Sequence, residues 1–542
     1  MHNSACRNLK HYLGLAFLSV FFISCSFRKE KISSNQLNLV PFKHQVGALN
    51  LPDHIAPINA PFQMPQLKKL SFPALSASIV ANGARDGTKV TRQIQQTIDD
   101  LNAKGGGTAI IPKGKWLTGR ITLKSNVNLH LEDGAELHFS GEIADYLPAV
   151  FTRNEGIEVM SLGACIYANG QEHIALTGKG RLIGPVKGGS VRTRTMTTQV
   201  IEEFVDLSKP VSQRIYEGQN GSPILPPMFI SPINCKNVLI EGVSLENTAF
   251  WNIVPVYCDR VIIRGVTVNS VGIPRGDGID IESSKNVLIE YSTLSSGDDC
   301  FTIKAGRGED GIRVNKASEN IVMRYCLARE GHGAVTVGSE TAGMIRNLYV
   351  HDCVFDETGT GIRFKTRRPR GGGAENIYYD RIRMTINGTA FNWDMLGSAQ
   401  HVGDLANRLP TRVINSLTPV FKNIVARNIV VERSSQFVKI NGIPESPLSN
   451  VQIEQVKVKS DKLFTAADVN GFSVKNATIE TKDSKISLLG VRKLTFENVQ
   501  FLVPGDSLNI VASSDEDVKF IKCKPKTKKE NCLVAKPISD QL

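Results

Sequence analysis

The sequence lacks three features, and each absence removes support for a class of protein. No CxxC pair and no histidine–cysteine cluster has the spacing of a zinc site. Beyond the N-terminal region, no apolar stretch is long enough to span a bilayer. Basic residues do not cluster with aromatic residues, as they do on nucleic-acid-binding surfaces. The sequence therefore gives no support for a zinc protein, an integral membrane protein or a nucleic-acid binder.

The sequence does have an excess of positive charge. Its 542 residues include 64 Lys and Arg against 52 Asp and Glu, a net charge of +12. Charged residues make up 21% and hydrophobic residues 41%, so the chain can bury a large core. A basic protein suits a polyanionic partner such as an acidic polysaccharide, or it simply has a basic surface. Charge alone leaves both interpretations open.

The first 25 residues have the pattern of a secretory signal peptide. A basic start, "MHNSACRNLKH", precedes an apolar run over residues 13–23 that is too short to span a bilayer as a mature helix. Cys25 stands where this run ends, and the segment resembles the lipobox of bacterial lipoproteins, with Phe22 in place of the usual leucine. We therefore expect an exported protein with a lipid on Cys25, in the periplasm or at the outer membrane of a bacterium. Cleavage by an ordinary signal peptidase would instead give a secreted protein.

The remaining chain divides by composition. Residues 26–75 are rich in Pro, Asn, Gln and Lys, and we expect a tether and an N-terminal extension there. One large domain is expected over residues 76–525, followed by a tail over 526–542. Cys523 and Cys532 are close enough in sequence to pair in an oxidising compartment.

A helix is predicted near the start of the large domain, over residues 91–103. Ile94, Ile98 and Leu101 share one of its faces, and glycines 105–107 end it. Such a helix would cap the open end of a β-structure, where strand edges would otherwise be unpaired.

Thirteen-residue segments with one pattern recur between residues 235 and 460. Examples are "CKNVLIEGVSLEN", "CDRVIIRGVTVNS" and "SKNVLIEYSTLSS", and most repeats are spaced by 23 to 29 residues. Alternating apolar residues indicate strands with one buried face. The sequence therefore predicts an all-β fold, a parallel β-solenoid with short strands in every coil. Asparagines recur near the start of the units, at Asn237, Asn286, Asn320, Asn347, Asn376, Asn423 and Asn450, and Arg260 takes this place in the second unit.

Four cysteines fit the predicted solenoid. Cys235 and Cys258 hold the same place in successive units, as do Cys326 and Cys353. Because buried cysteine behaves as a small hydrophobic residue, we expect each pair to stack without forming a disulfide.

Three aspartates lie about one coil apart. Asp277 is in "PRGDGIDIES", and Asp298 and Asp299 are in "LSSGDDCFTIKAG", so 21 residues separate Asp277 from Asp298. In a solenoid these acids would gather on one wall. Like charges this close resist joint ionisation, so one carboxyl should hold a proton at mildly acidic pH. Glycoside hydrolysis uses such a pair, a protonated acid beside an ionised carboxylate.

Cationic residues follow further along the chain. His332 lies in "REGHGAVTVGS", and Arg363 and Lys365, two apart in a predicted strand, point to the same face. Such cations would bind an acidic sugar. Each motif alone has a simpler explanation, namely a solvated or calcium-binding turn, a structural histidine or an exposed strand face. Their order along successive coils is much more specific.

Together these motifs resemble those of glycoside hydrolase family 28, the polygalacturonases. The family has Asn-Thr-Asp, Gly-Asp-Asp, Gly-His-Gly and Arg-Ile-Lys in this order; here the segments read "RGD", "GDD", "GHG" and "RFK". The resemblance runs from about Ala81 to at least Val425 and includes "GGGTAIIPKGKWLTG" and "WNIVPVYCDRV". It implies a right-handed parallel β-helix that hydrolyses α-1,4-galacturonosyl linkages with inversion and needs no metal or cofactor.

The resemblance also implies a role for each acid. Asp298 would be the general acid that protonates the glycosidic oxygen, and Asp277 and Asp299 would activate the attacking water. His332 would control the ionisation and position of the acid. An inverting pair usually stands about 6.5–9.5 Å apart to admit the water.

By the same comparison, Arg363 and Lys365 would bind a galacturonate carboxylate beside the scissile bond, and Lys304 would assist them. The chain departs from the family at Arg275 and Gly276, where the motif has Asn and Thr. Arginine there leaves the identity of the neighbouring sugar in doubt.

Two segments lengthen their coils, "AGRGEDGIRVNKAS" over residues 305–318 and a region over residues 185–230. Loops on the binding face would block one end of a groove. A groove blocked in this way resembles that of the exo-acting branch of the family. We therefore expect a monomer that trims pectin-derived polygalacturonate from its non-reducing end. Trp393, in "FNWDMLGSAQ", either stacks on a sugar or packs inside the fold.

Three other functions were considered. An α-galacturonidase or hydrolase acting on rhamnogalacturonan would use the same acids. A pectate lyase would need calcium ligands and a basic catalyst. A non-catalytic carbohydrate-binding solenoid would not need the complete set of acids.

Overall fold

The computed structural model describes residues 36–192, 201–512, 517–526, 532–533 and 539–541. The predicted signal peptide and Cys25 lie outside these residues, so both stay predictions. Among the helices within the described ranges, none has the length and apolar content needed to cross a membrane.

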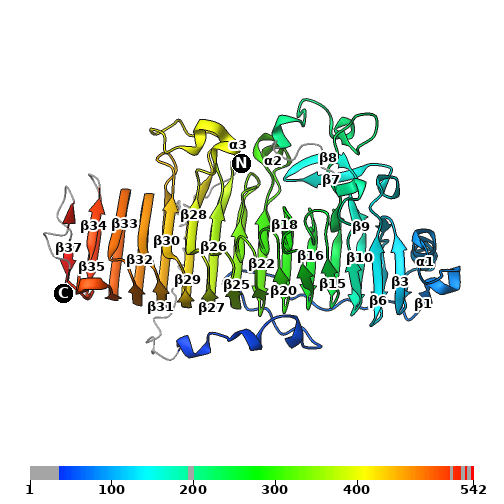
Figure 1. Cartoon of the computed structure of the whole chain (residues 1–542), viewed down its shortest axis with the longest axis horizontal. Coiled ribbons are helices and arrows are strands. Elements are labelled where there is room, and N and C mark those ends of the chain that lie inside the picture. The colour runs from blue at the N-terminus through cyan, green and yellow to red at the C-terminus, as the bar shows by residue number, and fades with distance from the viewer. Residues whose placement is uncertain (1–35, 193–200, 513–516, 527–531, 534–538, 542) are drawn as a thin grey trace, which may run out of the picture.

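Short strands stack along one long axis and form a right-handed parallel β-helix, as predicted (Figure 1). Most coils contribute a strand to each of three faces, and the coil over residues 236–256 reaches the third face through isolated bridges at Ile253 and Val256. The first face contains β2 (Gly107–Ile111), β5 (Val127–Leu131), β10 (Glu172–Gly178), β14 (Lys236–Glu241), β16 (Asp259–Arg264), β19 (Lys285–Glu290), β22 (Ser318–Arg324) and the first halves of β25 (Ile345–Asp356), β27 (Gly373–Thr385), β29 (Val420–Arg433) and β31 (Leu448–Ser460).

The second face contains β3 (Gly114–Thr118), β6 (Ala135–Phe139), β11 (Arg181–Ile183), β15 (Ser244–Glu246), β17 (Thr267–Asn269), β20 (Thr293–Ser295) and β23 (Leu327–Ala328). The third face contains β4 (Ile121–Thr122), β9 (Ala164–Asn169), β13 (Met228–Ile233), β18 (Ile279–Glu282), β21 (Phe301–Lys304), β24 (Val335–Val337), β26 (Thr360–Lys365), β28 (Thr389–Asp394) and β30 (Gln436–Asn441). The long strands β32 (Lys462–Thr481) and β33 (Lys485–Leu502) continue the stack, followed by β34 (Asn509–Ala512), β35 (Val518–Ile521), β36 (Cys532–Leu533) and β37 (Ser539–Gln541).

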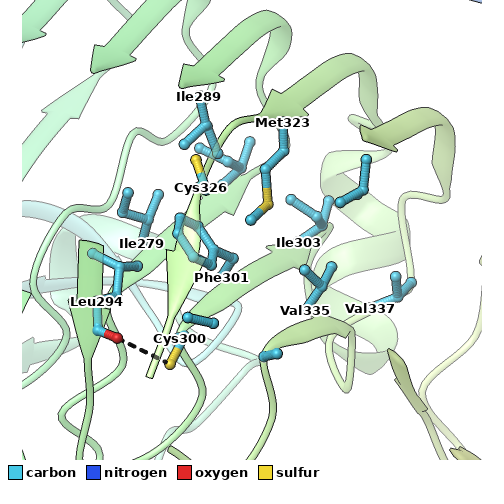
Figure 2. Close-up of a cluster of buried hydrophobic side chains, with 14 of the residues drawn as sticks. Ile279, Ile289, Leu294, Cys300, Phe301, Ile303, Met323, Cys326, Val335 and Val337 are labelled. Carbon is cyan, nitrogen blue, oxygen red and sulfur yellow. Dashed lines mark hydrogen bonds between the residues drawn. The ribbon is translucent and has the colours of Figure 1, made fainter. Parts of the chain in front are cut away.

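Inward-facing residues stack in register through the interior. Ile279, Phe301 and Val335 are paired along the third face, and all three are fully buried (Figure 2). Cys235, Cys258, Cys326 and Cys353 are also buried with unbridged thiols, so the predicted cysteine stacks are confirmed. Cys523 is buried, but the side chain of Cys532 lies outside the described part of the chain, so their pairing stays a prediction.

The repeated asparagines mark the corner where each coil enters the first face. All seven have a positive φ, between 51° and 59° for Asn237, Asn286, Asn320, Asn347, Asn376, Asn423 and Asn450. Asparagine tolerates this left-handed conformation better than most residues. Its side-chain amide also donates a hydrogen bond to the asparagine of the preceding coil. Asn347 donates to Asn320 at 3.0 Å, and Asn450 donates to Asn423 at 2.7 Å.

Helix α1 (Thr91–Ala103) covers the first coil, as predicted. Its apolar face, made of Ile94, Ile98 and Leu101, is buried against the β1 (Ser76–Ser78) and β2 end of the solenoid. The helix therefore shields strand edges that would otherwise be open.

Residues 36–75, which we call the N-terminal strap, lie along the outside of the first and second faces (Figure 1). Ile58 and Leu67 are buried in a cluster with outward-pointing residues of successive coils: Ala175, Leu239, Ile262, Leu288, Val322 and Tyr349. The strap runs opposite to the stacking direction, because Pro41 contacts Arg383 whereas Ser71 contacts His173.

Candidate active site

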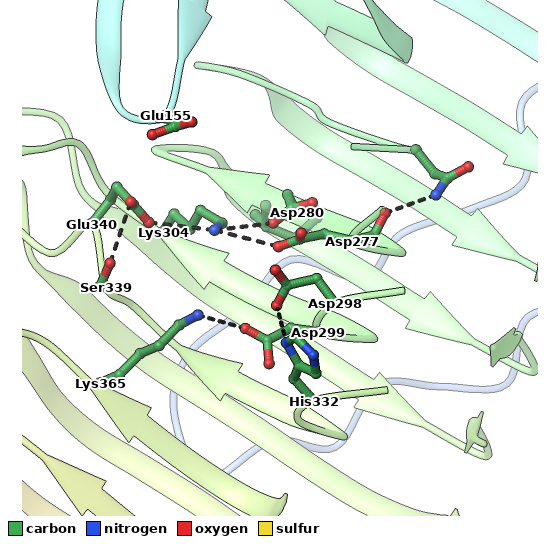
Figure 3. A network of polar contacts seen from close by, with 12 residues as sticks. Glu155, Asp277, Asp280, Asp298, Asp299, Lys304, His332, Ser339, Glu340 and Lys365 are labelled. Carbon is green, nitrogen blue, oxygen red and sulfur yellow. Dashed lines mark hydrogen bonds and ion pairs between the residues drawn. The ribbon is translucent and has the colours of Figure 1, made fainter. Parts of the chain in front are cut away.

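Four adjacent strands of the third face carry the predicted site. β18, β21, β24 and β26 pair in register, so that Asp280, Thr302, Thr336 and Arg363 lie in one row across the coils. The turns that bear the acids come directly before β18 and β21. The fold therefore brings the motifs together, as the repeat spacing predicts (Figure 3).

Asp277, Asp298 and Asp299 form a compact triad. One carboxylate oxygen of each lies within 4.8 Å of one from each of the others. This is the approach of the nearest oxygens, whereas the spacing of about 6.5–9.5 Å expected for an inverting pair describes the separation of whole carboxyl groups, so that expectation stays a prediction. The oxygens come this close because the two turns are neighbours in the stack, and adjacent strands stand only about 4.7–4.9 Å apart.

The triad is accessible from one side. The side chain of Asp298 is 25% exposed, whereas those of Asp277 and Asp299 are buried. His332 is 65% exposed, and its Nδ1 lies 3.0 Å from Oδ1 of Asp298. Asp298 is thus the acid of the triad that can reach a bound substrate.

Asp299 is held between the two cations of the "RFK" motif. Nη1 of Arg363 donates to Oδ1 and Nζ of Lys365 donates to Oδ2, both at 2.7 Å. Burial would raise the pKa of Asp299, but attraction to Lys365 and Arg363 brings this pKa well below its ordinary value. Asp299 is therefore ionised, and both cations lie next to the triad with their side chains partly exposed.

Asp277 differs from its neighbours in ionisation. Burial, with the nearby charges of Asp280 and Asp298, raises the pKa of Asp277 well above its ordinary value. The predicted shared proton is accordingly favoured on Asp277 in the empty site. Asp298 shows the reverse. Burial would raise the pKa of Asp298, but the hydrogen bond from His332, together with the charges of Lys365 and His332, lowers it. The same hydrogen bond raises the pKa of His332.

Lys304 lies under the triad, away from solvent. Its Nζ is 3.6 Å from Asp277, 3.4 Å from Asp280 and 3.3 Å from Glu340, and it lies 4.2 Å from the centre of the Trp251 ring. Burial would lower the pKa of Lys304, but these acids raise it. Lys304 therefore compensates buried acids, in contrast to the predicted contact with a substrate carboxylate.

The sequence analysis missed several residues around the triad. Asp280 and Glu340 are buried partners of Lys304, and Arg307 bonds Glu340 at 2.8 Å. The alternation of "GDGIDIES" places Asp280 on the outward-pointing side of its strand, a signal that could have identified it. Trp393 is buried against Phe364, so it packs inside the fold and does not stack on a sugar.

Loops close one side of the site. A hairpin of β7 (Val150–Asn154) and β8 (Ile157–Ser161) reaches over the third face toward α2 (Gly308–Val314) (Figure 1). In the predicted insertion over residues 185–230, Ile215 and Tyr216 pair with β8. Asp310 of α2 accepts from the backbone N–H of Glu158 at 2.9 Å, so the hairpin and the α2 loop are joined. A further loop, with α3 (Ala399–Val402), rises beyond β28.

Within the described residues, the triad is also the group of carboxylates that could hold a metal ion. Arg363, Lys365 and Lys304 already supply positive charge to these acids. The donor set is therefore better suited to proton transfer than to a divalent cation.

A parallel β-helix that presents three acids beside a histidine and an Arg-x-Lys pair defines a glycoside hydrolase. The family model described as "Glycosyl hydrolases family 28" matches residues 216–478, which include every motif of the site. The match spans just under half of the chain and, with the fold and the site, assigns the protein to the glycoside hydrolases.

Known proteins agree with this assignment. A probable polygalacturonase of Vitis vinifera is 28% identical over 471 residues, covering 84% of this chain and 87% of that protein. An exo-poly-alpha-D-galacturonosidase of Dickeya chrysanthemi is 27% identical, covering 57% of this chain and 54% of that protein. The crystal structure of a hyperthermoactive exopolygalacturonase from Thermotoga maritima superposes with a TM-score of 0.65 at 27% identity, covering 80% of this chain and 93% of that one.

Proposed function

We propose that this enzyme hydrolyses α-1,4-galacturonosyl linkages in polygalacturonate, with inversion, and releases galacturonate from the non-reducing end. The observation that carries the proposal is the pairing of the acid triad with Arg363 and Lys365. Both cations lie beside Asp299 and remain partly exposed, so a sugar carboxylate can approach them.

Each acid has a role consistent with its surroundings. Asp298 delivers to the glycosidic oxygen the proton that it shares with His332 across their 3.0 Å contact. Asp299, ionised by its two cations, accepts the proton of the attacking water, and Asp277 orients this water. Inversion is supported by the mechanism of the family, whereas the short spacing of the triad makes a direct stereochemical test necessary.

The exo mode is supported by the closed side of the site. The β7–β8 hairpin and the α2 loop cover the triad on the side of Asp277, while His332 stays exposed on the other. A polymer bound across the site would clash with the hairpin and the α2 loop, whereas a chain end fits against them. The test is product analysis on oligogalacturonate and on rhamnogalacturonan fragments. Monomeric galacturonate from oligogalacturonate alone is expected, and a ladder of oligomers would contradict exo action.

Arg275 favours a second candidate, an α-galacturonidase acting on rhamnogalacturonan. It stands two residues before Asp277, where the family motif has asparagine, and so it can alter which sugar is accepted. Release of galacturonate from rhamnogalacturonan fragments, with little from oligogalacturonate, would select this alternative.

We also propose export and a lipid on Cys25, as the first 25 residues predict. Replacement of Cys25 by Ser should release the protein from the membrane fraction. An unchanged distribution would contradict the lipid anchor.

A further inference from the structure

Three charged residues meet beside the triad without taking part in the reaction as described. Glu155 is at the tip of the β7–β8 hairpin, Arg275 precedes the first acid motif, and Arg307 belongs to the α2 loop. Oε1 of Glu155 lies 3.4 Å from Arg275 Nη1, and Oε2 lies 3.4 Å from Arg307 Nη2. Figure 3 shows Glu155 at the hairpin tip, on the same side of the site as Glu340 and Lys304.

The hairpin tip is firmly seated. The carbonyl of Gly156 accepts from the backbone N–H of Arg307 at 3.1 Å and from Nε of Arg153 at 3.2 Å. A Cβ added to Gly156, which has φ +84°, would stand 2.8 Å from Cγ of Glu340 and 2.9 Å from Cβ of Arg307. Only glycine permits so close an approach here, so the position of the Glu155 carboxylate is well defined.

Ion pairs connect this tip to the reacting groups. Arg307 contacts Glu340 at 2.8 Å, Glu340 contacts Lys304 at 3.3 Å, and Lys304 contacts Asp277 at 3.6 Å. The side chain of Glu155 is only 8% exposed. The Glu155 carboxylate is thus buried between two guanidinium groups at the closed side of the site.

We propose that Glu155, held by Arg275 and Arg307, is the end stop of the substrate groove. These two ion pairs fix the hairpin tip, which closes the row of sugar positions beside Asp277 and excludes a further uronate there. The proposal rests on the proposed exo-acting galacturonase and names the residues that enforce its chain-end specificity. It also accounts for the departure at position 275, since the hairpin tip requires a counterion that asparagine cannot supply.

The test compares Glu155→Gln and Arg275→Asn with the wild type on polygalacturonate and on defined oligogalacturonates. Chromatography gives the product lengths, and viscosity reports internal cleavage. Both variants should raise the share of products longer than the monomer by about 10-fold, the effect of losing about 1.4 kcal/mol of discrimination. Glu158→Gln is the matched control, because Glu158 is on the same hairpin but pairs with Arg313; this variant should keep the wild-type pattern.

The outcomes separate this inference from the proposed function. A wild-type enzyme that already yields an oligomer ladder overturns the exo proposal, and the end stop with it. A wild type that yields monomer, with folded Glu155→Gln and Arg275→Asn variants that also yield only monomer, overturns the end stop alone. The double variant should resemble Glu155→Gln, because both changes remove one contact. Additive effects would overturn the pairing of Glu155 with Arg275.

Discussion

Asp298 is the acid of the triad that combines exposure to substrate with a proton-bearing partner. We expect Asp298→Asn to lower kcat by roughly 10²–10⁴-fold, because an amide cannot protonate the leaving oxygen. The fold should be kept, since asparagine preserves the size of the side chain and can still bond to His332. Steady-state rates on trigalacturonate and the unfolding midpoint check this. Retention of most of the activity would contradict the role of Asp298.

Arg363 tests whether geometry or mere charge is needed beside Asp299. Arg363→Lys keeps the charge and loses the planar guanidinium that bonds Asp299 and is available to a sugar carboxylate. We expect kcat/KM to fall roughly 10- to 100-fold, because a charged hydrogen bond is worth about 1.5–3 kcal/mol. Arg346→Lys, which alters a pair with Glu375 on the first face, is the control. Equal effects of the two changes would contradict specific carboxylate binding at Arg363.

His332 sets the pH dependence that we expect. Its pKa is raised by the hydrogen bond to Asp298, so the shared proton is present at low pH and is lost as pH rises through this raised pKa. Activity should therefore decline on the alkaline side above the ordinary range of a carboxyl group. In His332→Gln the carboxyl must hold the proton alone, and the alkaline limb should move to lower pH.

The pH profile of kcat/KM checks this expectation. His138→Gln is a matched control, because His138 forms a similar pair with Glu136 in an early coil, far along the chain from the motifs. If the alkaline limb of His332→Gln falls at the same pH as in the wild type, the proton that reaches the glycosidic oxygen is held by a group other than the Asp298–His332 pair.

At the scale of elements, the contact between strap and solenoid depends on one buried carboxylate. Glu290, at the end of β19, bonds Arg264 at 2.8 Å and Arg324 at 2.8 Å. These arginines donate to strap carbonyls, those of Pro52 and Ala56 among them. Glu290 thus holds in place the cations that fasten the strap.

We expect Glu290→Gln to lower the free energy of unfolding by about 3–5 kcal/mol, because buried Arg324 loses its counterion and buried Arg264 keeps only Glu241. Glu375→Gln removes a more exposed partner of Arg346 and Lys422 and should cost less than about 1 kcal/mol. Urea unfolding of both variants provides the measurement. Equal losses would mean that the strap contributes little to stability.

Elements with a local signal were predictable. The alternation of apolar and polar residues and the recurring asparagines predicted the stacked strands. The apolar face of Ile94, Ile98 and Leu101 predicted α1. The β7–β8 hairpin and the strap were not predicted as such. Their positions depend on contacts with residues more than 100 positions away, such as Glu155 with Arg275, and no periodicity encodes such contacts.

For the whole molecule, stereochemistry is the decisive observable of mechanism. Inversion of an α-linked chain should give the β-anomer as the first product, detected by proton NMR before mutarotation. The close approach of the triad, with oxygens within 4.8 Å of one another, makes this test informative, because retaining enzymes hold their two carboxyl groups only about 5–5.5 Å apart. An initial α-anomer would indicate a covalent intermediate on Asp277 or Asp299.

The site was predictable in its membership and less so in its electrostatics. Motif order placed the acids, His332 and the Arg363–Lys365 pair on one wall, since residues one coil apart become neighbours in a solenoid. The location of the proton on Asp277 and the burial of Lys304 were not predictable. The raised pKa of Asp277 follows from burial and from the charges of Asp280 and Asp298, and Lys304 is buried between Asp280 and Glu340, which converge only after β18, β21 and β24 have stacked.

The reversed course of the strap has a consequence for the order in which the chain acquires its structure. Pro41 accepts a hydrogen bond from Arg383, and 342 residues separate them. A ribosome adding about 5–20 residues per second needs roughly 20–70 s to make that stretch. The N-terminal segment therefore emerges first and finds its full seat last, after β27 has formed. It therefore fastens the coils only after they have stacked as far as β27, and shorter chains remain unfastened.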